Sequence, residues 1–61
     1  MMVPEVSRAC ARVKNYENMG PGPQLDALIR AAETAQSIDE LPAWVKSILR
    51  KMNDPAMRTA A

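Results

Sequence analysis

Few side chains in this sequence are capable of covalent or metal chemistry. The chain has no histidine and a single cysteine, Cys10. A zinc or iron site needs several nitrogen or sulfur ligands, so we expect no metal site. Without histidine, the Ser–His and Cys–His pairs that activate most nucleophiles cannot form. The sequence therefore predicts a protein that is not an enzyme, with no catalytic residue and no cofactor, in which Cys10 is a buried and inert thiol.

Two short motifs resemble functional sites but are better explained as a connector between helices and as a helix cap. The Gly-Pro-Gly-Pro run at residues 20–23 lacks the Lys-Ser/Thr of a phosphate loop. Its prolines also remove backbone N–H groups that would hold a phosphate. Asp39 and Glu40 are adjacent and would point in different directions on a helix, so we expect them to cap a helix rather than share a proton.

Three basic residues lie toward the end of the last expected helix. Lys46, Arg50 and Lys51 follow Asp39 and Glu40 in the sequence. This order, acids first and bases last, is the one that the helix dipole favours. Helix electrostatics therefore explain the basic end, and a contact surface is the alternative.

The sequence argues against DNA binding, although a small nucleic-acid-binding regulator remains an alternative function. The turn at residues 36–38 lacks the glycine usual in a helix-turn-helix motif, and Pro42 occupies the part of the helix that would face the bases. The net charge of +1 also limits the counterion release that gives proteins nonspecific affinity for nucleic acid.

Trp44 is the sole tryptophan and lies at the edge of an apolar helix face. It could close the rim of the core, with its indole N–H directed to water or a carbonyl group. It could instead anchor a protein partner, because tryptophan and arginine dominate interface hot spots. Met52 has the same two alternatives, because methionine fills cores and also adapts to irregular partners. For the partner-binding alternative we expect contacts from six residues: Trp44, Leu49, Met52, Lys46, Arg50 and Lys51.

A second polar stripe runs along the first expected helix. Arg8, Arg12 and Asn15 recur at spacings of four and three residues, and Glu5 is close enough to pair with Arg8. We expect this stripe to be solvated, with a secondary partner contact at Arg8 and Arg12 as the alternative.

Hydrophobic spacing divides the chain into three expected helices. Apolar residues recur three and four apart over three segments, about residues 4–18, 23–36 and 39–52. Pro4 and Pro23 suit the first turns of two helices, and Gly20 is placed to cap the first. The sequence thus predicts an all-α fold, a small three-helix bundle formed as one domain by residues 1–61.

The start of the third helix and the C-terminal tail are the least regular parts of the pattern. A capping box that begins at Ser37 would place Pro42 inside the helix, where its missing N–H breaks a hydrogen bond. We therefore predict Asp39 as the N-cap, with Pro42 in the first turn. Residues 54–61 are expected either to add one or two helical turns, with Met57 folded back, or to fray.

The widths of the apolar faces predict how the helices pack. The face of the second helix spans about 160°, more than one neighbour needs, so this helix is expected to lie at the centre and touch both others. Its alanine ridge, at Ala27, Ala31 and Ala35, would allow close approach. The face of the first helix includes Tyr16 but is mostly Val, Ala and Cys, so we expect weak docking. An elongated arrangement that is ordered against a partner is the alternative.

Composition limits what so short a chain can bury. Hydrophobic residues make up 48% of the sequence, but ten of them are alanines and none is phenylalanine. A thin core favours a protein that binds a larger protein or itself, as an accessory or inhibitory protein, a homo-oligomer or a self-assembling structural subunit. By analogy of size, a phage or mobile element is an expected source. We find no signal peptide and no membrane span, and the lone cysteine favours the cytoplasm.

Overall fold

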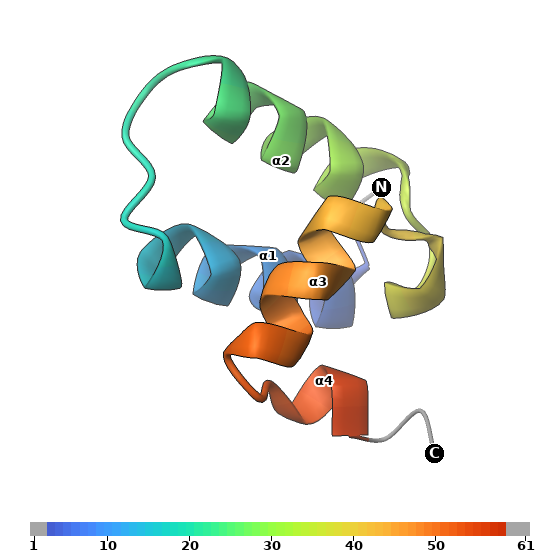
Figure 1. Cartoon of the computed structure of the whole chain (residues 1–61). Coiled ribbons are helices and arrows are strands. Elements are labelled where there is room, and N and C mark those ends of the chain that lie inside the picture. Colours follow the sequence, from blue (N-terminus) through green and yellow to red (C-terminus); the bar gives the residue numbers. More distant parts are fainter. Residues whose placement is uncertain (1–2, 59–61) are drawn as a thin grey trace.

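The computed structural model describes residues 3–58 and is an all-α bundle (Figure 1). Its three longer helices are α1 (Pro4–Tyr16), α2 (Pro23–Thr34) and α3 (Ala43–Lys51). A 3₁₀ turn, Ile38–Glu40, precedes α3, and a short helix, α4 (Pro55–Arg58), follows it. The predicted three-helix bundle is confirmed, and no strand occurs in the described range. None of the helices in this part of the chain has the length and apolar character needed to cross a bilayer.

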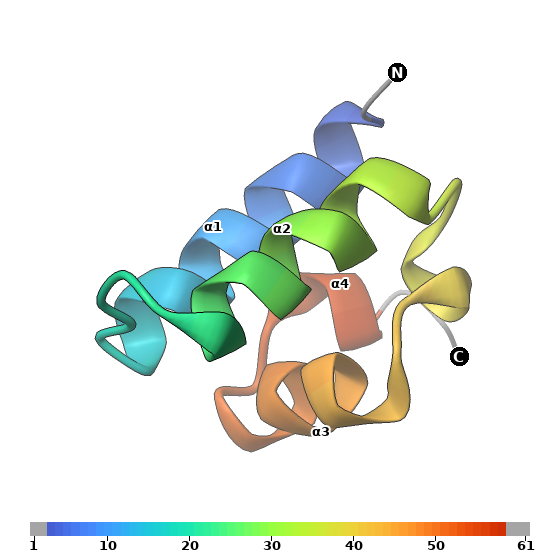
Figure 2. The same ribbon diagram turned by 90° about the horizontal axis from the view of Figure 1, so that it is seen from above.

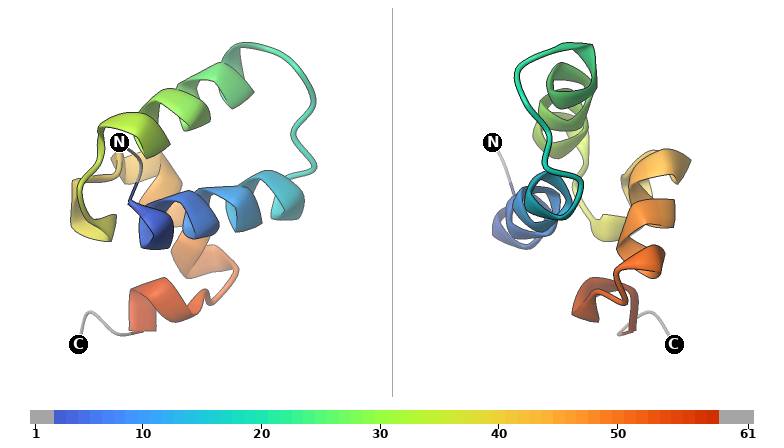
Figure 3. Two further views of the ribbon diagram at one scale, coloured as in Figure 1. Left: turned by 180° about the vertical axis from the view of Figure 1, so that it is seen from behind. Right: turned by 60° about the vertical axis from the view of Figure 1, so that its left-hand side comes forward.

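The helices form two layers. Figure 2 shows α1 and α2 side by side in antiparallel directions, and the right-hand view of Figure 3 shows α3 and α4 on one side of that pair. α1 packs against both α2 and α3, whereas contact between α2 and α3 is slight. The central helix is therefore α1, and the prediction that the second helix would be central was wrong.

The core consists mainly of small aliphatic side chains. In α1, Val6, Ala9 and Val13 have no exposed surface. Small side chains let helix axes approach closely, so α1 is buried on this face although it lacks large apolar residues. Tyr16, which was predicted on the buried face, is 48% exposed. It lies in the last turn of α1, where α1 and α2 diverge toward their connecting loop (Figure 1).

Two asparagines, rather than a glycine, end α1 and α3. Asn18 (φ 52°) and Asn53 (φ 55°) both have left-handed backbone conformations. After Asn18, the N–H of Met19 donates to the carbonyl of Lys14 (3.0 Å) and closes a Schellman motif. The equivalent bond after Asn53 is 2.9 Å long. Gly20 is therefore not the cap of α1, because asparagine also tolerates the left-handed conformation that this cap requires.

α3 begins later than predicted because Pro42 restricts the residue before it. Leu41 has φ −65° and ψ 149°, the extended conformation that residues preceding proline prefer. Pro42 is itself the N-cap of α3, and Asp39 lies in the 3₁₀ turn. The prediction of Asp39 as the N-cap was wrong. The side chain of Glu40 nevertheless accepts a hydrogen bond from a residue earlier in the chain: its Oε1 accepts the N–H of Gln36 (2.9 Å).

The C-terminal tail folds back onto the bundle. α4 adds a single helical turn, and Met57 and Ala56 are partly buried against the core. Of the two alternatives expected for the tail, residues 55–58 follow the one in which a further turn forms and Met57 folds back. The rest of the predicted tail, residues 59–61, lies outside the described residues.

Candidate protein-binding surface

An open groove lies along the α1–α2 pair. Its volume is about 150 Å³. Its walls are eight residues of the two helices: Ser7, Cys10, Ala11, Lys14, Leu25, Leu28, Ile29 and Ala32. No wall residue in the described range comes from α3 or α4, which lie on one side of the pair (Figure 3). The groove therefore belongs to the face of the pair that the second layer leaves uncovered.

The α2 wall of the groove carries a large exposed aliphatic side chain. Ile29 is 43% exposed, and Tyr16 is the one other large hydrophobic residue of the described chain that is exposed. Asp26 and Glu33 lie three and four residues from Ile29, on the same side of α2, and both are exposed. On the α2 side of the groove, an exposed aliphatic side chain is therefore flanked by two carboxylates.

The charges at the loop end of the groove belong to different helices. Lys14 is in the last turn of α1 and lines the groove, whereas Asp26 is in the first turn of α2. Within residues 3–58, neither of them forms an ion pair. Both charges are therefore available to groups on another molecule.

Cys10 forms part of the groove wall but is only 5% exposed. Burial raises the pKa of its thiol. A protonated thiol is a poor nucleophile, so Cys10 contributes apolar surface rather than reactivity. The prediction that this cysteine is buried is confirmed.

The residues that the sequence predicted as one patch on α3 differ in how deeply they are buried. Leu49 has no exposed surface and, with Val45, faces the interior. It is therefore a core residue, and its assignment as a partner contact is corrected. Trp44 and Met52 are partly buried and pack against the core. Their placement agrees with the alternative in which Trp44 closes the core rim.

The basic residues of α3 do not surround Trp44. At 100° per residue, Lys46 and Arg50 lie on the side of α3 away from Trp44, and only Lys51 shares its side. The Nζ of Lys46 donates to the backbone carbonyl of Asp39 (3.1 Å) and so stabilises the 3₁₀ turn. Arg50 and Lys51 are exposed. The six residues predicted as one patch are therefore distributed over the core and two separate edges of α3.

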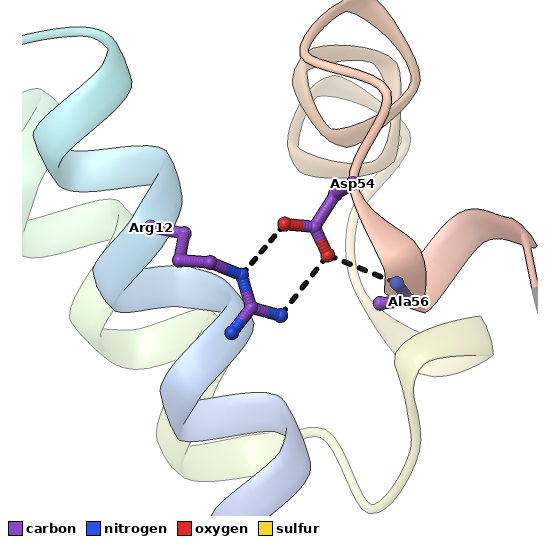
Figure 4. A network of polar contacts seen from close by, with 3 residues as sticks. All are labelled: Arg12, Asp54 and Ala56. Atoms are coloured by element: carbon purple, nitrogen blue, oxygen red, sulfur yellow. Dashed lines mark hydrogen bonds and ion pairs between the residues drawn. The ribbon is translucent and has the colours of Figure 1, made fainter.

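An unpredicted ion pair joins the two layers of the fold. The Nε of Arg12 donates to Oδ1 of Asp54 (2.6 Å) and its Nη2 donates to Oδ2 (3.0 Å), as Figure 4 shows. Asp54 is 2% exposed and is the single buried charged residue in the described chain. Its Oδ2 also accepts the N–H of Ala56 (3.0 Å), which caps α4. One carboxylate therefore connects α1 to the start of α4.

This pair changes the interpretation of the arginine stripe on α1. The hydrogen bonds from Arg12 lower the pKa of Asp54, and the same bonds raise the pKa of Arg12, while burial opposes both shifts. Arg12 is thus engaged within the chain rather than presented as a secondary partner contact. Arg8, the other residue predicted there, is exposed.

The broad apolar face of the second helix is the sequence signal for the groove. Its width predicts two neighbouring helices, but part of this face, including Ile29, borders the groove instead. Asp54 precedes Pro55, a common arrangement at helix starts, yet nothing in the spacing pairs it with Arg12. That contact joins residues 42 positions apart and depends on the tertiary fold.

The described residues present a surface rather than a reactive cluster. Within residues 3–58, no three His, Cys, Asp or Glu side chains gather closely enough to hold a metal ion. The buried side-chain nitrogen and oxygen atoms of this range all have hydrogen-bond partners. The most distinctive feature is therefore the groove, with the exposed Ile29 and with the charged residues Lys14 and Asp26 at its loop end. Comparison of the chain with protein-family models, curated proteins and solved structures finds no match.

Proposed function

We propose that this protein is a non-enzymatic protein–protein interaction module whose binding surface is the groove along α1 and α2. The observation that supports this most is the exposure of Ile29 beside an open, mostly apolar groove. Covering such a surface is favourable by about 25 cal/mol per Å² of apolar area. A helix of another chain is the type of ligand that such a groove accommodates.

The mechanism would be steric. An apolar side chain of the bound helix would enter between α1 and α2. The charges of Lys14 and Asp26 would fix the orientation of that helix. The protein would then act as an accessory or inhibitory subunit by occupying a surface of its partner. A cytoplasmic location is part of this proposal, because the lone, unpaired Cys10 suits a reducing compartment.

Affinity capture with matched variants tests this function. The full-length chain, carrying an affinity tag, is crosslinked in an extract of its source organism, and the bound proteins are identified by mass spectrometry. We expect Ile29→Glu to lose the captured proteins. Tyr16→Glu, which alters the other exposed large hydrophobic residue, should keep them. Trp44→Ala tests the competing surface on α3. Loss of capture with Trp44→Ala and not with Ile29→Glu would contradict the groove assignment.

A further inference from the structure

We infer that the occupant of the groove is a second copy of this chain, so that two α1–α2 faces stack in a symmetric dimer. This inference rests on the proposed function, since it names the partner of the same surface. In the dimer, a two-fold axis runs along the groove and places α2 of each copy antiparallel over α1 of the other. The two helix pairs would form a four-helix core, with α3 and α4 on the outside.

The shapes of the two groove walls support this arrangement. The α2 wall presents the exposed Ile29, and the α1 wall carries the small side chains of Ser7, Cys10 and Ala11, with Lys14 at its loop end. Figure 2 shows that α1 and α2 are antiparallel. Residues early in α1, such as Ser7 and Ala11, are therefore expected opposite residues late in α2, such as Ala32 and Ile29, and all four line the groove. Rotation about the groove axis therefore places each Ile29 on the small-residue wall of the other copy. A large side chain packed against small ones is the pattern by which helices interdigitate.

The charges support the same axis. Lys14, in the last turn of α1, and Asp26, in the first turn of α2, are both at the loop end of the helix pair, and neither forms an ion pair within residues 3–58. A two-fold axis along the groove keeps the two loop ends together, so Lys14 of each copy faces Asp26 of the other. Two symmetric ion pairs would result. The other face-to-face arrangement, with the axis across the helices, brings Asp26 beside Glu33 of the other copy, and these like charges repel.

The size of the face sets the expected strength of the dimer. Stable interfaces bury about 800 Å² on each partner. A face made of two helices of 13 and 12 residues is at the small end of this range. We therefore expect a dissociation constant in the micromolar range rather than the nanomolar range.

Sedimentation of the full chain over a concentration series tests the dimer. The wild-type chain should convert from monomer to dimer across the micromolar range, without higher oligomers. Ile29→Glu should weaken dimerisation by about tenfold or more, because it places a charge against an apolar wall. Tyr16→Glu should leave the dissociation constant unchanged. Circular dichroism verifies that each variant remains helical.

Charge reversal identifies the axis directly. Lys14→Glu and Asp26→Lys should each weaken self-association, because each homodimer then holds two like-charge contacts. An equimolar mixture of the two variants should associate again, because a heterodimer restores two opposite-charge contacts. Lys51→Glu, a reversal in the last turn of α3, is the matched control and should have no effect.

The outcomes separate this inference from the proposed function. Recovery of dimer in the mixture supports the inference. A wild-type chain that stays monomeric at millimolar concentration overturns it, and so does a dimer that is insensitive to Ile29→Glu or not restored by mixing. If the chain is monomeric but captures a different protein through Ile29, the proposed function stands and only the second-copy inference fails. If Ile29→Glu alters neither self-association nor capture, both fail.

Discussion

At the scale of single residues, Asp54 shows how one buried charge can organise a small fold. Its carboxylate accepts two hydrogen bonds from Arg12 and one from the N–H of Ala56. A buried carboxylate without such partners would be strongly unfavourable. The ion pair therefore matters less for its own attraction than for making the burial of Asp54 tolerable.

Removal of Arg12 should destabilise the fold while removal of Arg8 should not. Arg12→Gln leaves the Asp54 carboxylate buried without its charged donor, which costs about 1–3 kcal/mol. We expect a value near the lower end, because the Arg12 side chain is 43% exposed and solvent screens the pair. The control, Arg8→Gln, alters an exposed residue of the same helix and should change the free energy of unfolding by less than about 0.5 kcal/mol. Urea unfolding followed by circular dichroism measures both.

The contribution of Asp54 should also depend on pH. The pKa of Asp54 in the folded chain lies below its ordinary value of 3.8. Its stabilising effect is therefore complete above the ordinary value and is lost as the pH falls through the lowered pKa. The difference in unfolding free energy between wild type and Asp54→Asn should be constant near neutral pH and should shrink below pH 3.8. A difference that grows on acidification would contradict this account.

The backbone conformation of Gly22 restricts substitution at this position. It has φ 157° and ψ −177° at the N-cap of α2, a region that glycine alone occupies without strain. Gly22→Ala should therefore lower the free energy of unfolding by about 1–3 kcal/mol. Gly20, in the same loop, has no positive φ and open space around its Cβ position, so Gly20→Ala should be neutral or slightly stabilising. Thermal melting of the two variants measures both effects, and equal losses in Gly22→Ala and Gly20→Ala would contradict this role of Gly22.

At the scale of secondary-structure elements, the sequence predicts where the helices begin and end better than it predicts which helices pack against each other. Residue spacing and the prolines at positions 4 and 23 located α1 and α2 within two residues at each end. The late start of α3 is also encoded in the sequence, since Pro42 forces Leu41 out of the helical conformation, whereas the acidic pair before Pro42 suggests an earlier start. What spacing could not show was which helix would be central. That depends on how closely small side chains allow axes to approach.

Leu49 illustrates the same limit on α3. The sequence predicts Leu49 as a partner contact, yet the docking of α3 on α1 turns it fully inward. Leu49→Ala should cost about 2–5 kcal/mol, which is a large part of the total stability expected for so small a domain. Met52→Ala, at a partly buried position, should cost less. Equal and small losses in urea unfolding would indicate that Leu49 is at the surface after all.

At the scale of the whole molecule, the two-layer arrangement explains why the groove along α1 and α2 is uncovered. α3 and α4 cover one face of the α1–α2 pair, and no other helix of the described residues covers the opposite face. The core consists mainly of small side chains, and the uncovered groove lies on α1 and α2 rather than around Trp44. Its position could not be predicted, because it depends on which face of the pair α3 selects.

The most direct test of this account is the concentration dependence of backbone amide chemical shifts. The central claim is that the uncovered α1–α2 face binds a second copy. As the chain is concentrated from micromolar to millimolar, the amides of Ser7–Lys14 and Leu25–Glu33 should shift together along a single binding curve, while those of α3 remain in place. Shifts confined to residues around Trp44, or the absence of any shift, would contradict the claim.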